Sequence, residues 1–454
     1  MPQPLTTLLS TPQLSAEHRA LSAMPGLLHE KYRRNSKVFE SLASTKRKLG
    51  NPMHQDPKIS KLKFPSDADH RSRVERAQAA MKKAGIDVLA ISGFDYLRFF
   101  TGLNGLPIGR PIWLIILRQG SPTFVAPRSE AKEIRARCAT PVAAEWVEWE
   151  EPIPAPMSHQ DALAKYIAEI APDAQTIGVD FNSTWASNIE LVKQVLGAER
   201  IKDATSMLRT LLAFKNAVVI DGIRRATSIV AHQYVAAREA IAPGVPEWEV
   251  TLASVTAAIK RSAELLNEDV EQPRFWPHQM NMVASGPERT ARCHCSGGGR
   301  IMNDGENVQI CLCGQVFAGY GVCFDRPIAV GSKPLAVELR RVIDAARKAQ
   351  EAALATIRPG VAAGDVHAAA VEVIERGGWQ SPFLHRTGRG IGYSDWDGIE
   401  LKADSSVELE AGMVLSVEPG IYVDGVGGAR FGDTVLVTET GYEVLTPFEL
   451  GRDI

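Results

Sequence analysis

The chain has 454 residues, of which 45% are hydrophobic and 23% are charged, as in a soluble globular protein of two or three domains. Its 51 Lys and Arg nearly balance 53 Asp and Glu, for a net charge of -2, which excludes a global field that would recruit nucleic acid or a membrane surface. No apolar run approaches the ~20 residues of a membrane helix, and Met1 to Ser10 lack the pattern of a signal peptide. We therefore expect a cytoplasmic protein.

Residues 1 to 65 contain 11 Lys and Arg against four Asp and Glu, with weak apolar periodicity and recurring Pro and Ser. This composition is typical of an extension that lies on the body of the protein or is partly disordered. A basic arm that binds a partner is the alternative, and the sequence leaves it open.

Residues 66 to 208 predict a domain in which strands and helices alternate. Its first helix begins near Asp69, a candidate cap, and ends at Gly85. The following strands are predicted at 86–92, 112–117, 123–126 and 176–180, with a further helix at 188–196. Such alternation is typical of an α/β domain.

Residues 209 to 454 predict a second, α+β domain. Helices are expected over most of 215–265 and over 334–357 and 363–376, the last two ending at Pro-Gly or Gly-Gly stops. Strand-like runs lie between and after them, at 307–313, 328–330, 413–417, 433–438 and 443–446. Two helix pairs interleaved with antiparallel strands fit this fold class.

Three segments of the second domain carry a family resemblance: His385 to Gly392, Leu409 to Tyr422 and Gly427 to Glu439. Together they resemble the pita-bread fold family, which contains methionine aminopeptidase, aminopeptidase P, prolidase and creatinase. The first domain resembles the amino-terminal domain of that family through its Gly-Ile-Asp-Val-Leu and Phe-Thr-Gly segments. The resemblance implies an α/β amino-terminal domain followed by an α+β pita-bread catalytic domain. It does not by itself fix the chemistry.

The peptidases of that family hold two metal ions with two Asp, one His and two Glu, a ligand set that suits Mn, Co or Zn. Carried over position by position, those ligands fall here on Leu312, Cys323, Arg389, Glu418 and Gly432. A leucine cannot ligate, and an arginine puts a fixed positive charge where a dication would lie. We therefore expect no dinuclear metal site and no cofactor.

Creatinase works without a metal, and its active site is similar to several stretches of this chain. The resemblance implies that His294 shuttles protons, while Asp325 and Glu418 orient the substrate. Arg110 would bind the substrate carboxylate from a neighbouring subunit, with Arg389 or Arg430 as a second clamp. Further substrate contacts are expected from Trp276 and His385. An ion pair between Glu418 and Arg389 is the structural alternative for that carboxylate.

Six cysteines are too few for a disulfide scaffold, and free thiols in a reducing compartment are expected. Five of them are close in sequence, at positions 293, 295, 311, 313 and 323. With His294 they could form a thiolate zinc site, although Cys-x-Cys is not the usual spacing. Cys323 could instead contact substrate or act as a nucleophile, if His294 lowers its pKa.

These observations favour a metal-independent, creatinase-like hydrolase that cleaves a C–N bond of a small carboxylate-bearing molecule. We expect a homodimer, because creatinase-like sites use a loop of the partner subunit, and no nucleic acid or membrane partner. A lyase, a thiol-dependent hydrolase, or a binding protein that has lost the peptidase metals remain as alternatives.

Overall fold

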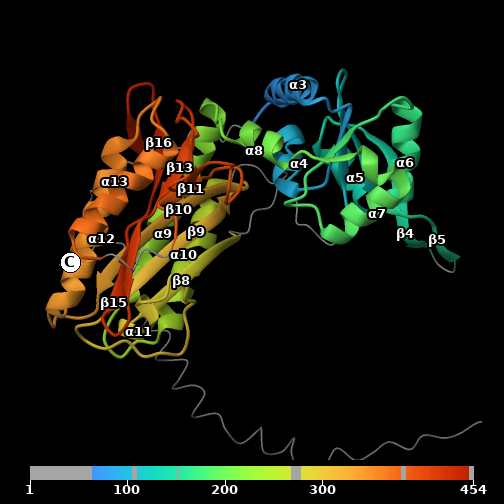
Figure 1. Ribbon diagram of the computed structural model, residues 1–454. Coiled ribbons are helices and arrows are strands. Elements are labelled where there is room, and N and C mark those ends of the chain that lie inside the picture. The colour runs from blue at the N-terminus through green and yellow to red at the C-terminus, as the bar shows by residue number, and fades with distance from the viewer. Residues whose placement is uncertain (1–63, 105–109, 151–152, 267–277, 380–384, 449–454) are drawn as a thin grey trace, which may run out of the picture. The chain divides into compact units, whose positions relative to one another are not determined.

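The structure is a computed structural model that describes residues 64–104, 110–150, 153–266, 278–379 and 385–448 (Figure 1). The predicted extension at residues 1 to 65 lies almost wholly outside the described residues. Among the helices described, none combines the length and the apolar character that crossing a lipid bilayer requires.

The first domain is built on a seven-stranded sheet in the order β5-β4-β3-β2-β1-β6-β7. Most of these strands were predicted, and the structure confirms them to within two residues. β1 pairs antiparallel with β2 and parallel with β6, so the sheet is mixed. The strands are β1 (Val88–Ile91), β2 (Trp113–Leu117), β3 (Thr123–Pro127), β4 (Val142–Glu150), β5 (Ile153–Met157), β6 (Ile177–Val179) and β7 (Ile201–Asp203).

Six α-helices accompany this sheet. The first begins one turn earlier than expected, because Ser66 rather than Asp69 is its cap. The Ser66 side chain accepts from the backbone N–H of Asp69, whose carboxylate accepts from the Ser66 backbone in return. Gly85 ends the helix in the left-handed region, at φ 68°. The helices are α3 (Asp67–Ala84), α4 (Phe94–Thr101), α5 (Arg128–Arg137), α6 (His159–Ile170), α7 (Ala186–Leu196) and α8 (Thr205–Leu212).

The second domain contains two long helix pairs, as the sequence predicts. α9 and α10 pack on the sheet β10-β9-β8, and α12 packs on the β14–β15 ribbon, so the strands lie between the two pairs (Figure 1). The helices of this domain are α9 (Ala217–Ala240), α10 (Glu247–Leu266), α11 (Pro287–Thr290), α12 (Val337–Thr356) and α13 (Ala363–Arg376).

The strands of this domain form a three-stranded sheet, a two-stranded ribbon and a five-stranded sheet in the order β12-β11-β13-β16-β17. An isolated bridge between Asp325 and Gly432 joins the three-stranded sheet to the segment between β15 and β16. The strands are β8 (His278–Ser285), β9 (Asn307–Phe317), β10 (Tyr320–Ala329), β11 (Gly388–Gly390), β12 (Glu400–Leu401), β13 (Val414–Val417), β14 (Gly420–Val423), β15 (Gly427–Arg430), β16 (Asp433–Val437) and β17 (Tyr442–Val444).

The hairpin of β9 and β10 determines which side chains face the site. Its register pairs Cys313 with Cys323 and Cys311 with Asp325. Because side chains alternate along a strand, these four lie on one face and Leu312 points to the other. The polar face therefore meets β13 and β15, whereas Leu312 is completely buried in the apolar core.

Candidate active site

A cavity of about 1010 Å³ opens in the second domain, large enough for a small organic molecule. Most of the side chains around it are ionisable, so charged and polar groups of a ligand find partners there. The lining residues are Cys293, His294, Cys311, Cys313, Gly314, His367, His385, Arg386, Arg389, Asp395, Trp396, Glu400, Lys402, Glu418 and Arg430.

Asp325 and Arg430 form a fully buried ion pair at the base of this cavity. Both Nε and Nη2 of Arg430 lie 2.9 Å from Oδ1 of Asp325, and the two side chains are 3% and 0% exposed. Burial raises the pKa of Asp325, while the adjacent guanidinium opposes that rise. Asp325 therefore holds Arg430 in place and does not itself line the cavity.

Glu418 follows β13 and is held by two donors. The Ser416 hydroxyl donates to Oε1 at 2.5 Å, and Nη1 of Arg389 contacts the same oxygen. Burial favours the neutral form of this carboxyl, but the charges of Arg389 and Arg430 outweigh it and lower the pKa of Glu418 to about 2. The ion pair with Arg389, considered above as an alternative for Glu418, is thus present.

Arg389 is oriented by the chain segment beyond β11. Its Nε donates to the carbonyl of Asp395 at 2.5 Å. That segment is fixed by Asp397, which accepts from the backbone N–H groups of Tyr393 and Ser394 and forms a fully buried ion pair with Lys215 at 2.9 Å. The carbonyl that positions Arg389 therefore depends on a buried charge pair that sequence reasoning missed.

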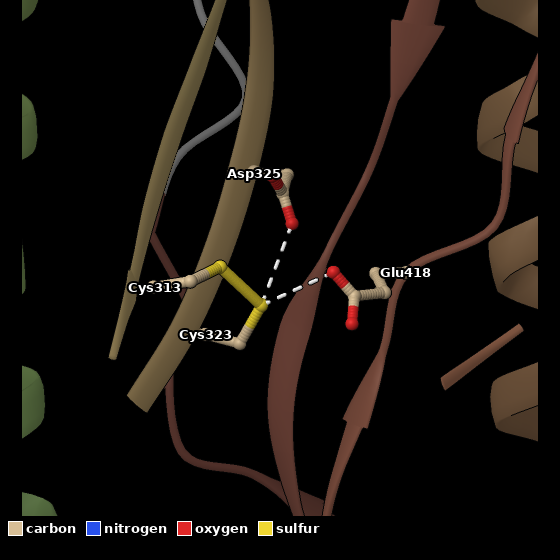
Figure 2. A group of neighbouring side chains, drawn as sticks. All are labelled: Cys313, Cys323, Asp325 and Glu418. Carbon is tan, nitrogen blue, oxygen red and sulfur yellow. Dashed lines mark hydrogen bonds between the residues drawn. A yellow bond between two sulfur atoms is a disulfide. The ribbon is translucent and has the colours of Figure 1, made fainter. Parts of the chain in front are cut away.

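The sulfur atoms of Cys313 and Cys323 are bonded to one another across the strand pair (Figure 2). Free thiols were predicted at both positions, and this disulfide corrects the prediction. Cys323 is only 1% exposed, and a bonded sulfur has no thiolate to offer, so the nucleophile hypothesis for Cys323 is wrong for this state of the protein. The other described cysteines, including Cys293, are free.

The residues present do not fit the dinuclear metal set of the peptidases. Leu312 points into the core, and the guanidinium of Arg389 contacts the one retained carboxylate, Glu418. At Gly432 an added side chain would collide with Oδ2 of Asp325, so no glutamate fits there. The residues at these positions therefore do not supply the ligand set that binds a pair of dications in the peptidases.

A second group of polar side chains lies around His385, which packs against Tyr422 on β14. Nδ1 of His385 lies 2.8 Å from the carbonyl of Arg386, so this nitrogen carries the proton and Nε2 accepts from the Tyr422 hydroxyl, also at 2.8 Å. Nη1 of Arg430 donates to the same hydroxyl at 3.4 Å. Tyr422 therefore links the Arg430 guanidinium to the His385 imidazole.

His294 follows α11 and is largely exposed at the cavity. Its Nε2 lies 4.0 Å from Sγ of Cys293. Partial burial, together with the charge of Arg430, lowers the pKa of His294, and burial lowers that of His385. Both imidazoles are therefore neutral at neutral pH and can accept a proton. Burial raises the pKa of the Cys293 thiol, which keeps it protonated.

The structure does not bring all of the predicted site residues together. His294, Arg389, His385 and Glu418 line one cavity, with Asp325 and Cys323 buried beneath it. Arg110 does not line that cavity in its own chain, so its predicted role in a neighbouring subunit stays a prediction. Trp276 lies outside the described residues.

Strand alternation correctly separates Asp325 from its neighbour. Arg326 points to the opposite face and donates to both carboxylate oxygens of Asp433, at 2.9 and 3.1 Å.

Tyr422 was missed, because nothing in its sequence context distinguishes it from a core tyrosine. Its position on β14 beside Arg430 on β15 becomes visible only once the ribbon is paired.

Comparisons with known proteins agree with this architecture. The sequence pattern of metallopeptidase family M24 matches residues 221–439, and that of the creatinase/prolidase N-terminal domain matches residues 73–211. The chain is 67% identical over 390 residues to a protein of Rhizobium rhizogenes named agropine synthesis cyclase, covering 86% of this chain and 98% of that one.

Two further relatives are named as dipeptidases. The probable dipeptidase PepE of Mycobacterium tuberculosis is 30% identical over 373 residues, covering 81% of this chain and 92% of that one. The crystal structure of dipeptidase PepE from Mycobacterium ulcerans superposes with a TM-score of 0.71 at 27% identity, covering 86% of this chain and 99% of that one. The chain therefore belongs to metallopeptidase family M24, a hydrolase family, with a creatinase/prolidase N-terminal domain before a pita-bread catalytic domain.

Proposed function

We propose that this protein is a cyclase built on a hydrolase scaffold. It closes or opens a ring in agropine or in a closely similar carboxylate-bearing molecule, and it does so without a metal ion. The observation that carries the proposal is the 67% identity to agropine synthesis cyclase over 98% of that protein. Ring closure with loss of water and ring opening by water are one reaction run in two directions, so a hydrolase scaffold suits both.

The polar groups of the cavity supply what this reaction needs. A neutral imidazole, His294, accepts the proton of the attacking group, which is a substituent of the substrate in ring closure and a water in ring opening. The imidazolium then returns this proton to the leaving group, which departs as water in ring closure and as the freed substituent of the substrate in ring opening. Nη1 of Arg430 and the hydroxyl of Tyr422 stabilise the negative charge that develops on the attacked carboxyl oxygen. Asp325 holds the Arg430 guanidinium in place, and Arg430 in turn contacts the Tyr422 hydroxyl.

Metal independence belongs to the same proposal. The family's dications would polarise the attacked carbonyl and activate water. Here the guanidiniums of Arg389 and Arg430, held by Glu418 and Asp325, supply fixed positive charge at the base of the cavity instead. Cleavage of an acyclic C–N bond, as in creatinase, stays a prediction. It is less favoured, since both carboxylates expected to bind a cationic substrate already hold an arginine.

The test is turnover by metal-free protein. The full chain, treated with a chelator until no transition metal is detected, is incubated with agropine and separately with its ring-opened acid. Mass spectrometry should detect gain or loss of one water in an enzyme-dependent manner. Absence of both conversions at any metal content, with the folded protein verified, refutes the cyclase assignment.

Two histidine variants sharpen the test. His294→Ala should lower the rate by about 10²–10⁴-fold, the usual contribution of a general base. His232→Ala is the matched control, because His232 lies exposed on α9 and bonds only the Ser228 carbonyl of its own helix among the contacts described. Equal activity of both variants would remove His294 from the mechanism.

A further inference from the structure

Four buried side chains converge at the base of the cavity, and two of them, Asp325 and Glu418, also hold the arginines of the ring chemistry proposed above. They are Cys313 and Cys323 from the β9–β10 hairpin, Asp325 from β10 and Glu418 after β13 (Figure 2). One ligating atom from each lies within 4.8 Å of all the others. Sγ of Cys323 is 3.3 Å from Oε2 of Glu418 and 3.6 Å from Oδ2 of Asp325.

In each of the two carboxylates, one oxygen contacts an arginine and the other faces the Cys323 sulfur. Oδ1 of Asp325 accepts from Arg430, and Oε1 of Glu418 accepts from Arg389 and Ser416. The second oxygen of each, Oδ2 and Oε2, faces the Cys323 sulfur. Each carboxylate is thus oriented by an arginine on one side and presents a lone pair to the sulfur pair on the other, the arrangement expected of metal ligands with outer hydrogen bonds.

The separations suit one small ion. Zinc binds thiolate sulfur at about 2.3 Å and carboxylate oxygen at about 2.0–2.2 Å in a tetrahedron, whose sulfur–oxygen edges are then roughly 3.5 Å. The two measured edges, 3.3 and 3.6 Å, bracket that value. The two sulfurs must also separate, which breaking their bond permits.

Formal charge also balances. Two thiolates and two carboxylates carry four negative charges, while a divalent ion and the guanidiniums of Arg389 and Arg430 carry four positive charges. The ion replaces the two thiol protons, so the buried group is neutral with or without it. A soft sulfur pair with two oxygens selects a thiophilic divalent ion over Mn²⁺ or Mg²⁺.

We propose that the reduced protein binds one Zn²⁺, or a similarly thiophilic divalent ion, at Cys313, Cys323, Asp325 and Glu418. Two equivalents of a small thiol, or one phosphine with water, first reduce the disulfide to two thiols. The ion then binds and releases both thiol protons to solvent. Cys313 also lines the cavity, which gives the ion a path of entry. The site overlaps the family's dinuclear site at Cys323 and Glu418, but with Cys313 and Asp325 it forms a different ligand set that holds one ion instead of two.

Zinc titration tests the proposal directly. The full chain is reduced with a phosphine, freed of metal and titrated with Zn²⁺ against a chromophoric chelator. One ion per chain is expected, and Co²⁺ in its place should give a sulfur-to-metal charge-transfer band. Protein reoxidised with a disulfide-forming reagent should bind none. Binding below one-tenth of an ion per chain, or equal binding after oxidation, would overturn the proposal.

Cysteine variants locate the site. Cys313→Ser should weaken zinc binding by at least about tenfold, as even loss of a supporting group does, and should reduce the charge-transfer band, because only the Cys323 thiolate remains. Cys295→Ser is the control, because Cys295 is a free, half-buried thiol outside the group. Equal weakening in both variants refutes the assignment. Wild-type binding, measured apart from turnover, separates this result from that of the cyclase proposal.

Discussion

Replacing Arg430 by leucine tests the buried ion pair at the base of the cavity. The substitution leaves the completely buried Asp325 carboxylate without the guanidinium that gives it two contacts of 2.9 Å. Breaking a buried pair by removing one partner costs about 3–5 kcal/mol, because the remaining charge is uncompensated. At about 2–4 °C per kcal/mol for a domain of this size, the catalytic domain should melt roughly 6–20 °C lower.

The pH dependence of the loss has a definite sign. Without Arg430, burial raises the pKa of Asp325 further above its unfolded value of ~3.9. An acid with a raised pKa in the folded state destabilises the protein above that pKa and not below the unfolded value. The difference in melting temperature between variant and wild type should therefore shrink as the pH falls from 8 towards 5.

The assay is thermal denaturation of the full chain, followed by fluorescence across this pH range. An Arg430→Leu/Asp325→Asn double variant should recover most of the loss, because removing both charges of a buried pair is close to neutral. A decrease of less than about 4 °C (about 1 kcal/mol) would refute the reasoning. So would a double variant as unstable as the single one, or a loss independent of pH.

Three further outcomes follow from the same geometry. Lys215→Met should cost about 3–5 kcal/mol in urea denaturation, because it leaves the buried Asp397 carboxylate unpaired. Gly432→Ala should lower the melting temperature by several degrees, about 1–3 kcal/mol of overpacking, because its methyl group meets the Asp325 carboxylate. The pH profile of kcat/KM should rise along a titration below pH 6.5, because burial and a nearby arginine lower the pKa of His294, whose neutral form is the base.

Each of these outcomes has a matched control. Lys348→Met is the control for Lys215→Met. It removes an exposed ion pair between Lys348 and Asp344, both on α12, and should lower the free energy of unfolding by less than about 1 kcal/mol. Gly441→Ala adds a methyl group where no atom lies within 4 Å and should leave the melting temperature unchanged. Two results would contradict His294 as the base. One is a midpoint of the kcat/KM profile above pH 6.5, and the other is the same rise of kcat/KM with pH in the His294→Ala variant.

The fold was largely predictable from local sequence patterns. Apolar runs at strand spacing located β2, β3 and β13, and Gly and Pro-Gly stops located the ends of α12 and α13. Family motifs then predicted how these elements assemble. The first helix began earlier than expected because Ser66 is the cap and Asp69 is the third residue of its capping box.

The structure brings several of the proposed site residues together, but the contacts between them were not predicted. The family resemblance suggested Arg389, Glu418 and Asp325 as site residues, yet a resemblance between motifs cannot tell which arginine pairs with which carboxylate. The Cys313–Cys323 contact depends on the register of a hairpin whose turn includes Ala318 at φ 47° and Gly319 at φ 72°. A shift of one residue in this register would place the two sulfurs on opposite faces of the hairpin, so the pairing needs the three-dimensional structure.

The most direct test of the central claim measures ring closure and ring opening as a function of bound metal. We predict that protein with less than about one-tenth of a transition metal ion per chain, held in excess chelator, turns over agropine or its ring-opened acid at the full rate. Loss of turnover on chelation, with recovery on adding Mn²⁺, Co²⁺ or Zn²⁺, would contradict the account in which Arg389 and Arg430 supply the positive charge of the site.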